Sequence, residues 1–436
     1  MKQKIFQIVC MALAALMLAG CGRQAEQREI QPTTERSRDI HMLRTEWSST
    51  ETGYYRLYNR TEDGVNLCYV DFTTGQNSFV CNQPACQHAE KSCNSYFKGR
   101  SHGILFSNME HLYFLKYTDS SENPMKLYRM NLDGSDHKLI HTFRKDEFFF
   151  MNPAYPAFDG QYIYFIITSW DDETMHNIPK LLQINVDTGK TTALLICNQN
   201  IGTEEGQQPY IVEPHLVGAH ERTLYLTVSY LKETSNLTGL AGSDEDAQNM
   251  LTSLLALDLN TGKIEVVDTW KNADRRYRVQ DDQMYYVDFI EKALKVWHIK
   301  TGETHVISSN LKVRNADDTI LRSIYDGKCI VDIFNPEQQR YFRYAVNLQT
   351  GEISALSLEY HEDDETYYVH IKLEMADSFI VIYDQKEEAH HVLHKDGTLE
   401  EVIESEPQYA RIKKDDYWNN IPNYDPIAAL EDAFSA

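Results

Sequence analysis

Positive charge is scarce in this chain of 436 residues, which carries 42 lysines and arginines against 65 aspartates and glutamates, a formal net charge of −23. Proteins that bind nucleic acid derive much of their affinity from Lys and Arg contacts to phosphate, and segments that lie on anionic lipid also need basic residues. The composition therefore argues against both kinds of binding. The excess of acidic residues is itself typical of a soluble protein surface.

The short motifs of the common enzyme classes are also missing. The sequence contains no G-x-S-x-G nucleophile elbow, no H-E-x-x-H zinc motif, no P-loop and no G-x-G-x-x-G loop. The sialidase motif Ser-x-Asp-x-Gly-x-x-Trp is absent as well. We therefore expect a non-catalytic binding module for a peptide, a glycan or an envelope protein. A polysaccharide-active enzyme and an envelope-assembly scaffold are the alternatives, and converging carboxylates beside exposed aromatic rings would favour the enzyme.

No apolar run reaches the roughly 20 residues that a membrane-spanning helix needs. The run from Ile5 to Leu18 is shorter, follows Lys2 and Lys4, and ends in small residues, which is the pattern of a secretory signal. Leu18-Ala19-Gly20-Cys21 resembles the lipobox of bacterial lipoproteins. That resemblance implies cleavage before Cys21, a diacylglycerol on its thiol, and a protein anchored in the cell membrane and facing outside the cytoplasm. An ordinary signal peptide that happens to contain Cys21 is the alternative.

The chain divides into four parts by composition. The segment after Cys21, GRQAEQREIQPTTERSRD, is too polar to bury the surface that folding requires. The predicted boundaries are a signal peptide at 1–20, the lipidated Cys21 and a flexible tether at 21–45, a folded body at 46–410, and a closing strand with a tail at 411–436.

Helical periodicity is lacking from the body, and a β-repeat takes its place. Seven times an alternating apolar run leads into a polar pair and a glycine and then into a second run, as in KLYRMNLDGSDHKLI. Asp-Gly and Thr-Gly supply the positive φ of a tight turn, so each copy predicts a β-hairpin. The turn glycines are Gly75, Gly134, Gly189, Gly262, Gly302, Gly351 and Gly397.

An aromatic and β-branched strand precedes each hairpin, for example HLYFLKY and TLYLTVSY, and a further strand such as Gly103–Ser107 fits between units. Repeats of about 40–50 residues with four strands each are typical of radial blades. The sequence therefore predicts an all-β fold, a β-propeller of seven four-stranded blades. Eight blades and a pair of sandwiches are the alternatives.

A family resemblance rests on the second unit, where the strand His111 to Tyr117 is followed by Leu-Tyr-Arg-Met-Asn-Leu-Asp-Gly-Ser from Leu127 to Ser135. This unit resembles a blade of the low-density-lipoprotein-receptor-type (YWTD) propellers and of the TolB-like propellers. The body as a whole resembles bacterial lipoproteins that carry such propellers as a domain of unknown function. The resemblance implies the fold, and it implies no particular ligand, because propellers host many unrelated functions.

Long loops between the second and third strands of each blade are the expected binding face, because binding sites concentrate on loops that a rigid scaffold positions. An acidic rim of this kind suits calcium or a basic peptide, although no Asp-x-Asp-x-Asp-Gly loop is present. Solvated acidic loops are the alternative interpretation. The acidic residues of these loops are Asp119, Glu122, Asp171, Asp172, Glu173, Asp244, Glu245 and Asp246.

Cysteine is sparse, with 8 in the chain, yet three of them and a histidine fall within CNQPACQHAEKSC. Cys81, Cys86, His88 and Cys93 form a complete donor set for a structural zinc ion. Because the compartment permits disulfides, a second possibility is a Cys68–Cys81 bridge across the first hairpin with Cys86–Cys93 beside it. Free thiols are the third possibility. In each case the expected role is to staple the link between the first two blades.

Two further segments carry expectations of their own. The acidic and aromatic run from Tyr360 to Tyr368 is interpreted as an inter-blade loop rather than a catalytic carboxylate pair. Residues Arg411 to Tyr417 are expected to form a strand that closes the ring against the first blade, with Tyr417, Trp418 and Tyr424 packed on the body.

Overall fold

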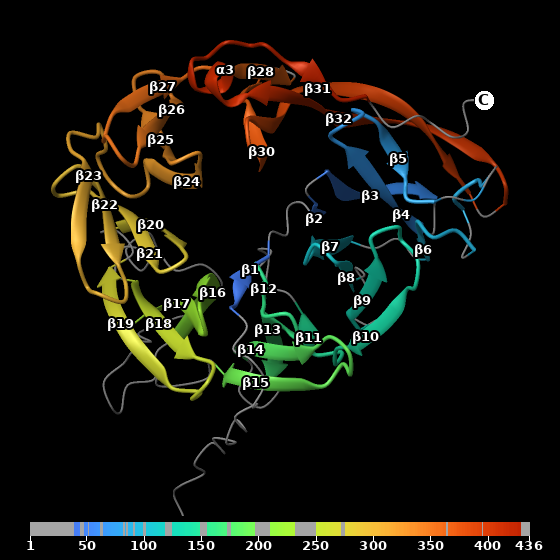
Figure 1. The fold of residues 1–436 in the computed structure, drawn as a ribbon, viewed down its shortest axis with the longest axis horizontal. Helices are drawn as coiled ribbons and strands as arrows, with labels where there is room; N and C mark the ends of the chain where they lie inside the picture. The colour runs from blue at the N-terminus through green and yellow to red at the C-terminus, as the bar shows by residue number, and fades with distance from the viewer. Residues whose placement is uncertain are drawn as a thin grey trace, which may run out of the picture.

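The protein is an all-β propeller of seven blades, seen here in a computed structural model (Figure 1). The structure describes residues 39–43, 48–50, 52–61, 64–81, 83, 86–89, 92–98, 102–117, 124–148, 155–171, 176–196, 210–231, 250–271, 275–362, 365–394 and 396–428. The predicted signal peptide and Cys21 lie outside these residues.

Blades 1 to 4 follow one another around the ring, each with its strands in chain order from the centre outward. Blade 1 contains β2 (Ser48–Ser49), β3 (Gly53–Thr61), β4 (Gly64–Asp71), β5 (Asn77–Phe79) and β6 (Tyr96–Lys98). Blade 2 contains β7 (His102–Ser107), β8 (His111–Tyr117), β9 (Lys126–Asn131) and β10 (Lys138–Thr142). Blade 3 contains β12 (Ala157–Phe158), β13 (Tyr162–Asp171), β14 (His176–Asn185) and β15 (Thr191–Ile196), with β1 (His41–Met42) and β11 (Glu147–Phe148) added. Blade 4 contains β16 (Tyr210–His220), β17 (Thr223–Leu231), β18 (Leu251–Asp258) and β19 (Ile264–Lys271).

Blades 5 to 7 complete the ring. Blade 5 contains β20 (Arg275–Gln280), β21 (Gln283–Asp288), β22 (Ala293–His298) and β23 (Thr304–Ser308). Blade 6 contains β24 (Thr319–Tyr325), β25 (Lys328–Asn335), β26 (Arg340–Asn347) and β27 (Ile353–Leu356). A hairpin of β28 (Glu359–Glu362) and β29 (Glu365–Tyr368) links it to blade 7, which contains β30 (His370–Glu374), β31 (Ser378–Leu393), β32 (Leu399–Lys413), the helix α3 (Lys414–Trp418) and β33 (Asp425–Pro426).

The core is divided among the interfaces between neighbouring blades. Period-2 alternation gives every inner strand two apolar faces. On β17, Leu224 and Leu226 pack with side chains of blade 3, whereas Tyr225 between them packs with blade 5. Among the described residues, seven buried clusters fill the seven interfaces in this way, and the last contains Tyr54 of blade 1 and Ile380 of blade 7.

The seven predicted turn glycines all adopt positive φ, between 68° and 85°. In blades 1 to 6 the turn joins the third strand to the outer strand, as expected. Blade 7 departs from this plan, because β31 continues for 16 residues as one strand, and the Gly397 turn therefore joins the second and third strands. This turn lies at the tip of a long hairpin that reaches blade 1, where Leu393 pairs with Thr61 in parallel.

Some of these glycines also allow close approach of the neighbouring blade. A Cβ at Gly189 would lie 2.0 Å from the carbonyl oxygen of Ile140 in blade 2, whereas a Cβ at Gly302 would have no heavy atom within 4 Å. Both positions carry the penalty of positive φ, about 1–2 kcal/mol. We expect Gly189→Ala to lower the free energy of unfolding by at least about 2 kcal/mol more than Gly302→Ala, measured by urea denaturation. Equal losses for the two variants would contradict this account of the blade contact.

The folded body begins before residue 46. The strand β1 pairs with β12 in blade 3, and Ile40 and Leu43 on either side of it are 3% and 4% exposed. The Ile40 N–H donates to the Glu221 carbonyl of blade 4 at 2.8 Å. Residues 39–43 of the predicted tether are therefore an inner extension of blade 3, because their alternating apolar side chains complete the cores around it.

The C-terminal segment closes the ring in a different way from the prediction. Arg411 lies opposite Ile380 within blade 7 rather than beside blade 1, because the long β31 pairs along its length with the similarly long β32. Residues 414–418 then form the helix α3. Tyr417 and Trp418 pack at the interface of blades 6 and 7, and Tyr424 stacks on Tyr383, as expected. After α3 the chain contacts blade 1 through Ile427 in the shared core and through the Ala428 N–H, which donates to the Gly75 carbonyl.

Among the described residues, no helix has the length and apolar character needed to cross a membrane.

Candidate metal centre and ligand cavity

The cysteine cluster occupies an insertion within the outer edge of blade 1. The strand β4 pairs with β5 through Cys68, Tyr69 and Val70, and with β6 through the residues from Gly64 to Asn66. The outer strand of this blade is thus split into two halves, and the four residues of the cluster lie between them in the chain. The prediction that placed the cluster in the link after blade 1 is therefore wrong, because the cluster lies before β6, which still belongs to blade 1.

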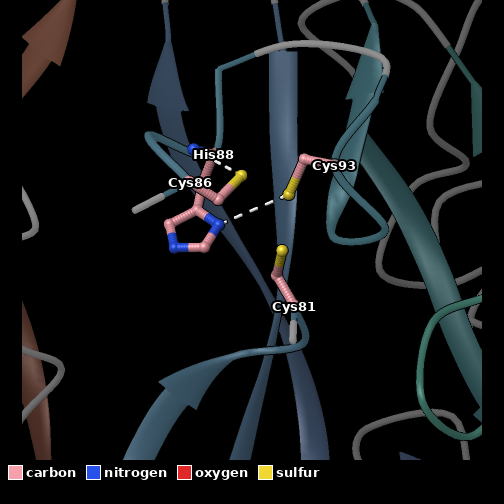
Figure 2. A group of neighbouring side chains, drawn as sticks. All are labelled: Cys81, Cys86, His88 and Cys93. Carbon is pink, nitrogen blue, oxygen red and sulfur yellow. Dashed lines mark hydrogen bonds between the residues drawn. The ribbon is translucent and has the colours of Figure 1, made fainter. Parts of the chain in front are cut away.

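The four predicted ligands converge on one point (Figure 2). The sulfurs of Cys81, Cys86 and Cys93 and a ring nitrogen of His88 all lie within 4.8 Å of one another. The His88 Nδ1 is 3.3 Å from the Cys93 sulfur, and the His88 backbone N–H donates to the Cys86 sulfur at 3.4 Å. A tetrahedral zinc ion with Zn–S bonds of about 2.3 Å holds its sulfurs ~3.8 Å apart, so the donor set fits such an ion.

Blade 1 orients these ligands through hydrogen bonds and packing. The Asn66 amide donates to the His88 carbonyl at 2.8 Å and to the Ser95 hydroxyl at 3.1 Å. The His88 ring stacks on Phe79 of β5, with centroids 4.5 Å apart, and its backbone adopts φ of 56°. The ligands are therefore held by the sheet that they border, as preorganised metal sites require.

The thiols of the cluster differ in acidity. Burial raises the pKa of Cys93 to about 12 despite hydrogen bonds from Ser95. For Cys81, burial also acts to raise the pKa, but hydrogen bonds from the Gln83 backbone and from the thiols of Cys93 and Cys86 outweigh it, and the pKa is lowered. A bound cation would deprotonate such thiols outright.

The disulfide alternative is not supported at Cys68. The register places Phe79, rather than Cys81, opposite Cys68. Each residue of β4 thus faces a partner two positions earlier in the chain than predicted, and Cys81 lies beyond the end of β5. No disulfide joins the five cysteines that the structure describes. Cys329 is fully buried in the core between blades 5 and 6, and Cys197 lies outside the described residues.

The predicted binding loops fall almost wholly outside the described residues. Asp171 ends β13, and nothing is described of its side chain. The other candidates lie outside the described part of the chain: Asp119, Glu122, Asp172, Glu173, Asp244, Glu245 and Asp246.

A cavity of about 670 Å³ lies between blades 6 and 7, with Arg278 of blade 5 at its side. Its walls come from β20, β24, β25, β26, β30 and α3, and the hairpin β28–β29 contributes four residues. That hairpin is the predicted inter-blade link, and it belongs to the same face as the loops between second and third strands. The lining residues are Arg278, Arg322, Ser323, Tyr325, Ile330, Asp332, Arg340, Tyr341, Arg343, Tyr360, Thr366, Tyr367, Tyr368, His370, Ile371 and Tyr417.

A buried ion-pair network forms the floor of this cavity. Asp332 on β25 is 2% exposed and accepts hydrogen bonds from Arg343 at 2.8 and 3.0 Å and from the Arg322 Nε at 2.9 Å. The Arg343 guanidinium also lies over the Tyr368 ring, 4.7 Å from its centroid. Burial would lower the pKa of Arg343, but hydrogen bonds to Asp332 outweigh it and the pKa is raised.

The arginines of the cavity were not predicted as site residues from the sequence. Arg278, Arg322, Arg340 and Arg343 come from three strands in two blades, and no short motif joins them. Two features of the sequence could have indicated the cavity: basic residues on predicted strands of an acidic chain, and the aromatic run from Tyr360 to Tyr368.

Comparisons with known proteins add no family assignment. The sequence matches no protein-family model and no curated protein. Among solved structures, the chain is similar to a prolyl endopeptidase, with 10% identity, 86% of this chain and 55% of that chain covered, and a TM-score of 0.48. It is similar to the β-propeller domain of the Trilobed protease from Pyrococcus furiosus, with 10% identity, 89% and 99% covered, and a TM-score of 0.39. It is also similar to oligogalacturonate lyase from Vibrio parahaemolyticus, with 11% identity, 76% and 90% covered, and a TM-score of 0.37. Likeness at this level does not extend to activity.

Proposed function

We propose that the protein is a non-catalytic binding module that holds its ligand in the cavity between blades 6 and 7. The observation that carries this proposal is the cavity itself, whose volume of about 670 Å³ is that of a small-molecule or oligomer-end site. Its polar groups come mainly from strands, and its lining combines hydrogen-bonding side chains with tyrosine rings.

The chemistry of the lining favours binding over glycoside hydrolysis. That reaction ordinarily uses two carboxyl groups that flank the scissile bond. The lining holds one carboxylate, Asp332, and both of its oxygens accept hydrogen bonds from arginines. Arginines rather than carboxylates converge here, so the arrangement is suited to holding a ligand.

A cavity-filling substitution tests this proposal. Thr366 is an exposed lining residue on β29, and Thr366→Trp should weaken binding of any ligand found on a panel of glycans and peptides by at least about tenfold, because the indole would occupy the cavity. Thr301→Trp, in an exposed turn of blade 5, is the matched control and should bind as the wild type does. A ligand that binds both variants equally well would place the binding site elsewhere.

We also propose that the protein is lipid-anchored at Cys21 and presents the propeller outside the cytoplasm. The support is the lipobox-like Leu18-Ala19-Gly20-Cys21 behind a short apolar run. Two or more acyl chains give stable membrane attachment. Mass spectrometry of the membrane-extracted protein, before and after Cys21→Ser, tests the modification.

We propose further that the Cys81–Cys86–His88–Cys93 cluster binds one zinc ion with a structural role. Three thiolates and an imidazole complete a tetrahedral shell and leave no position for a substrate. The ion would tie the four ligands to the split edge of blade 1, whose two halves pair with β4 through three residues each.

A further inference from the structure

The cavity between blades 6 and 7 concentrates positive charge in an acidic chain. Four arginines and one aspartate line it, whereas the whole chain has a formal net charge of −23. We infer that it binds a small ring compound that carries a carboxylate, of the size of a sugar acid. This inference rests on the proposed function, which makes the cavity the ligand site.

Two of the arginines keep hydrogen-bond donors for a ligand. Arg278 donates to the Ser323 hydroxyl at 3.1 Å and has no carboxylate partner among the described residues. Arg322 lines the cavity, its side chain is 48% exposed, and its Nε donates to Asp332, so the terminal nitrogens of its guanidinium remain as donors for a ligand. A guanidinium has five donors in a planar fork that matches a carboxylate.

The other two arginines define the rim and the floor. Arg340 pairs with Glu359 and donates to the Tyr368 hydroxyl, so its charge is partly neutralised. Arg343 is committed to Asp332 and is a positioning residue, since it fixes the carboxylate that orients Arg322. The ligand carboxylate would therefore lie toward Arg278 and Arg322.

Aromatic faces in the same lining indicate a ring on the ligand. Tyr360 and Tyr367 of the hairpin β28–β29 stack with centroids 5.6 Å apart and an interplanar angle of 22°. Tyr367 is 38% exposed. Flat, amphipathic tyrosine rings provide contact area for the apolar face of a ring together with hydroxyl groups for its polar edge. A bare inorganic anion would make no use of them.

The charge of the remaining surface favours a small ligand over an acidic protein. A large acidic partner would meet a chain whose net charge of −23 has the same sign as its own, and like charges disfavour association. A small acid would contact only the residues that line the cavity.

Titration of the purified full chain with five probes tests the inference, with saturation-transfer NMR to detect weak binding. The probes are glucuronate, benzoate, glucose, sulfate and a tetraglutamate peptide.

We expect glucuronate or benzoate to bind, the sugar acid and the aromatic acid being two sources of the same chemistry. Glucose and sulfate should bind at least about tenfold more weakly, because glucose lacks the negative charge and sulfate lacks the ring. Arg278→Ala and Arg322→Ala should each weaken binding of the acid by about tenfold or more, the equivalent of one charge-assisted hydrogen bond. Arg144→Ala, an exposed arginine of blade 2, should leave the affinity unchanged.

Each contrary result is informative. If glucose binds as well as glucuronate, the ligand needs no carboxylate. If sulfate binds as well, the ligand needs no ring. Tighter binding of tetraglutamate would show that the cavity prefers an acidic peptide to a small acid. These results leave the proposed function intact if Thr366→Trp still blocks the site. Absence of binding by both ring acids overturns the inference, and the wider ligand panel with Thr366→Trp then decides the proposed function separately.

Discussion

Replacement of Cys93 by serine is expected to reduce the zinc content of the purified protein from about one ion per chain to near zero and to lower its stability. Cys93 is 2% exposed and lies at the centre of the cluster, 3.3 Å from the His88 Nδ1. Serine removes the thiolate that a zinc ion prefers and keeps the size of the side chain. If free zinc is 1,000-fold above its Kd, the bound ion stabilises the folded state by about 4 kcal/mol, and the variant loses that amount.

Elemental analysis and urea denaturation, with and without a chelator, measure these effects. The matched control is Cys329→Ser, which also removes a buried thiol but lies in the core between blades 5 and 6, so it should keep the zinc. The chelator should lower the stability of the wild type and of Cys329→Ser but leave Cys93→Ser unchanged. Wild-type protein that carries no zinc and no free thiols in the cluster would instead show disulfides between its cysteines.

Replacement of Asp332 by alanine is expected to destabilise the protein by about 3–5 kcal/mol. The carboxylate is 2% exposed, and its removal leaves the Arg343 guanidinium buried without its counter-ion. Loss of one partner from a buried ion pair costs about this much, because the remaining charge is uncompensated. Denaturant unfolding monitored by tryptophan fluorescence gives the value.

Asp317→Ala provides the contrast for this prediction. The Asp317 side chain is 85% exposed and lies 3.4 Å from Arg276, so its removal should cost less than about 1 kcal/mol. The double variant Asp332→Ala with Arg343→Met should recover part of the loss, because no buried charge then remains unpaired. Equal effects of Asp332→Ala and Asp317→Ala would show that the floor of the cavity is not a buried ion pair.

The repeat was predictable because it depends on local rules. Gly134 and Gly189 have positive φ in the turns where Asp-Gly and Thr-Gly predict it, and the strands before them alternate as buried strands do. Seven such units specify a ring without any knowledge of long-range contacts. The cysteine cluster was predictable for a similar reason, since its ligands lie within thirteen residues of one another.

Features that depend on distant segments were not predictable in this way. The strand β1 pairs with a blade more than a hundred residues later, and its short apolar run, from Ile40 to Leu43, resembles the tether around it. The Cys68 register was misjudged because a two-residue difference in a hairpin turn changes every cross-strand partner. The arginines of the cavity come together only when blades 5 and 6 are packed against each other.

If the cavity holds a ligand without converting it, the ligand leaves the protein chemically unchanged. Mass spectrometry of the bound ligand, after prolonged incubation with a stoichiometric amount of the purified protein, measures this. We expect the wild type to release the ligand with its mass unchanged, and Thr366→Trp to retain little of it. A product formed by the wild type but not by Arg322→Ala would show instead that the cavity is an active site.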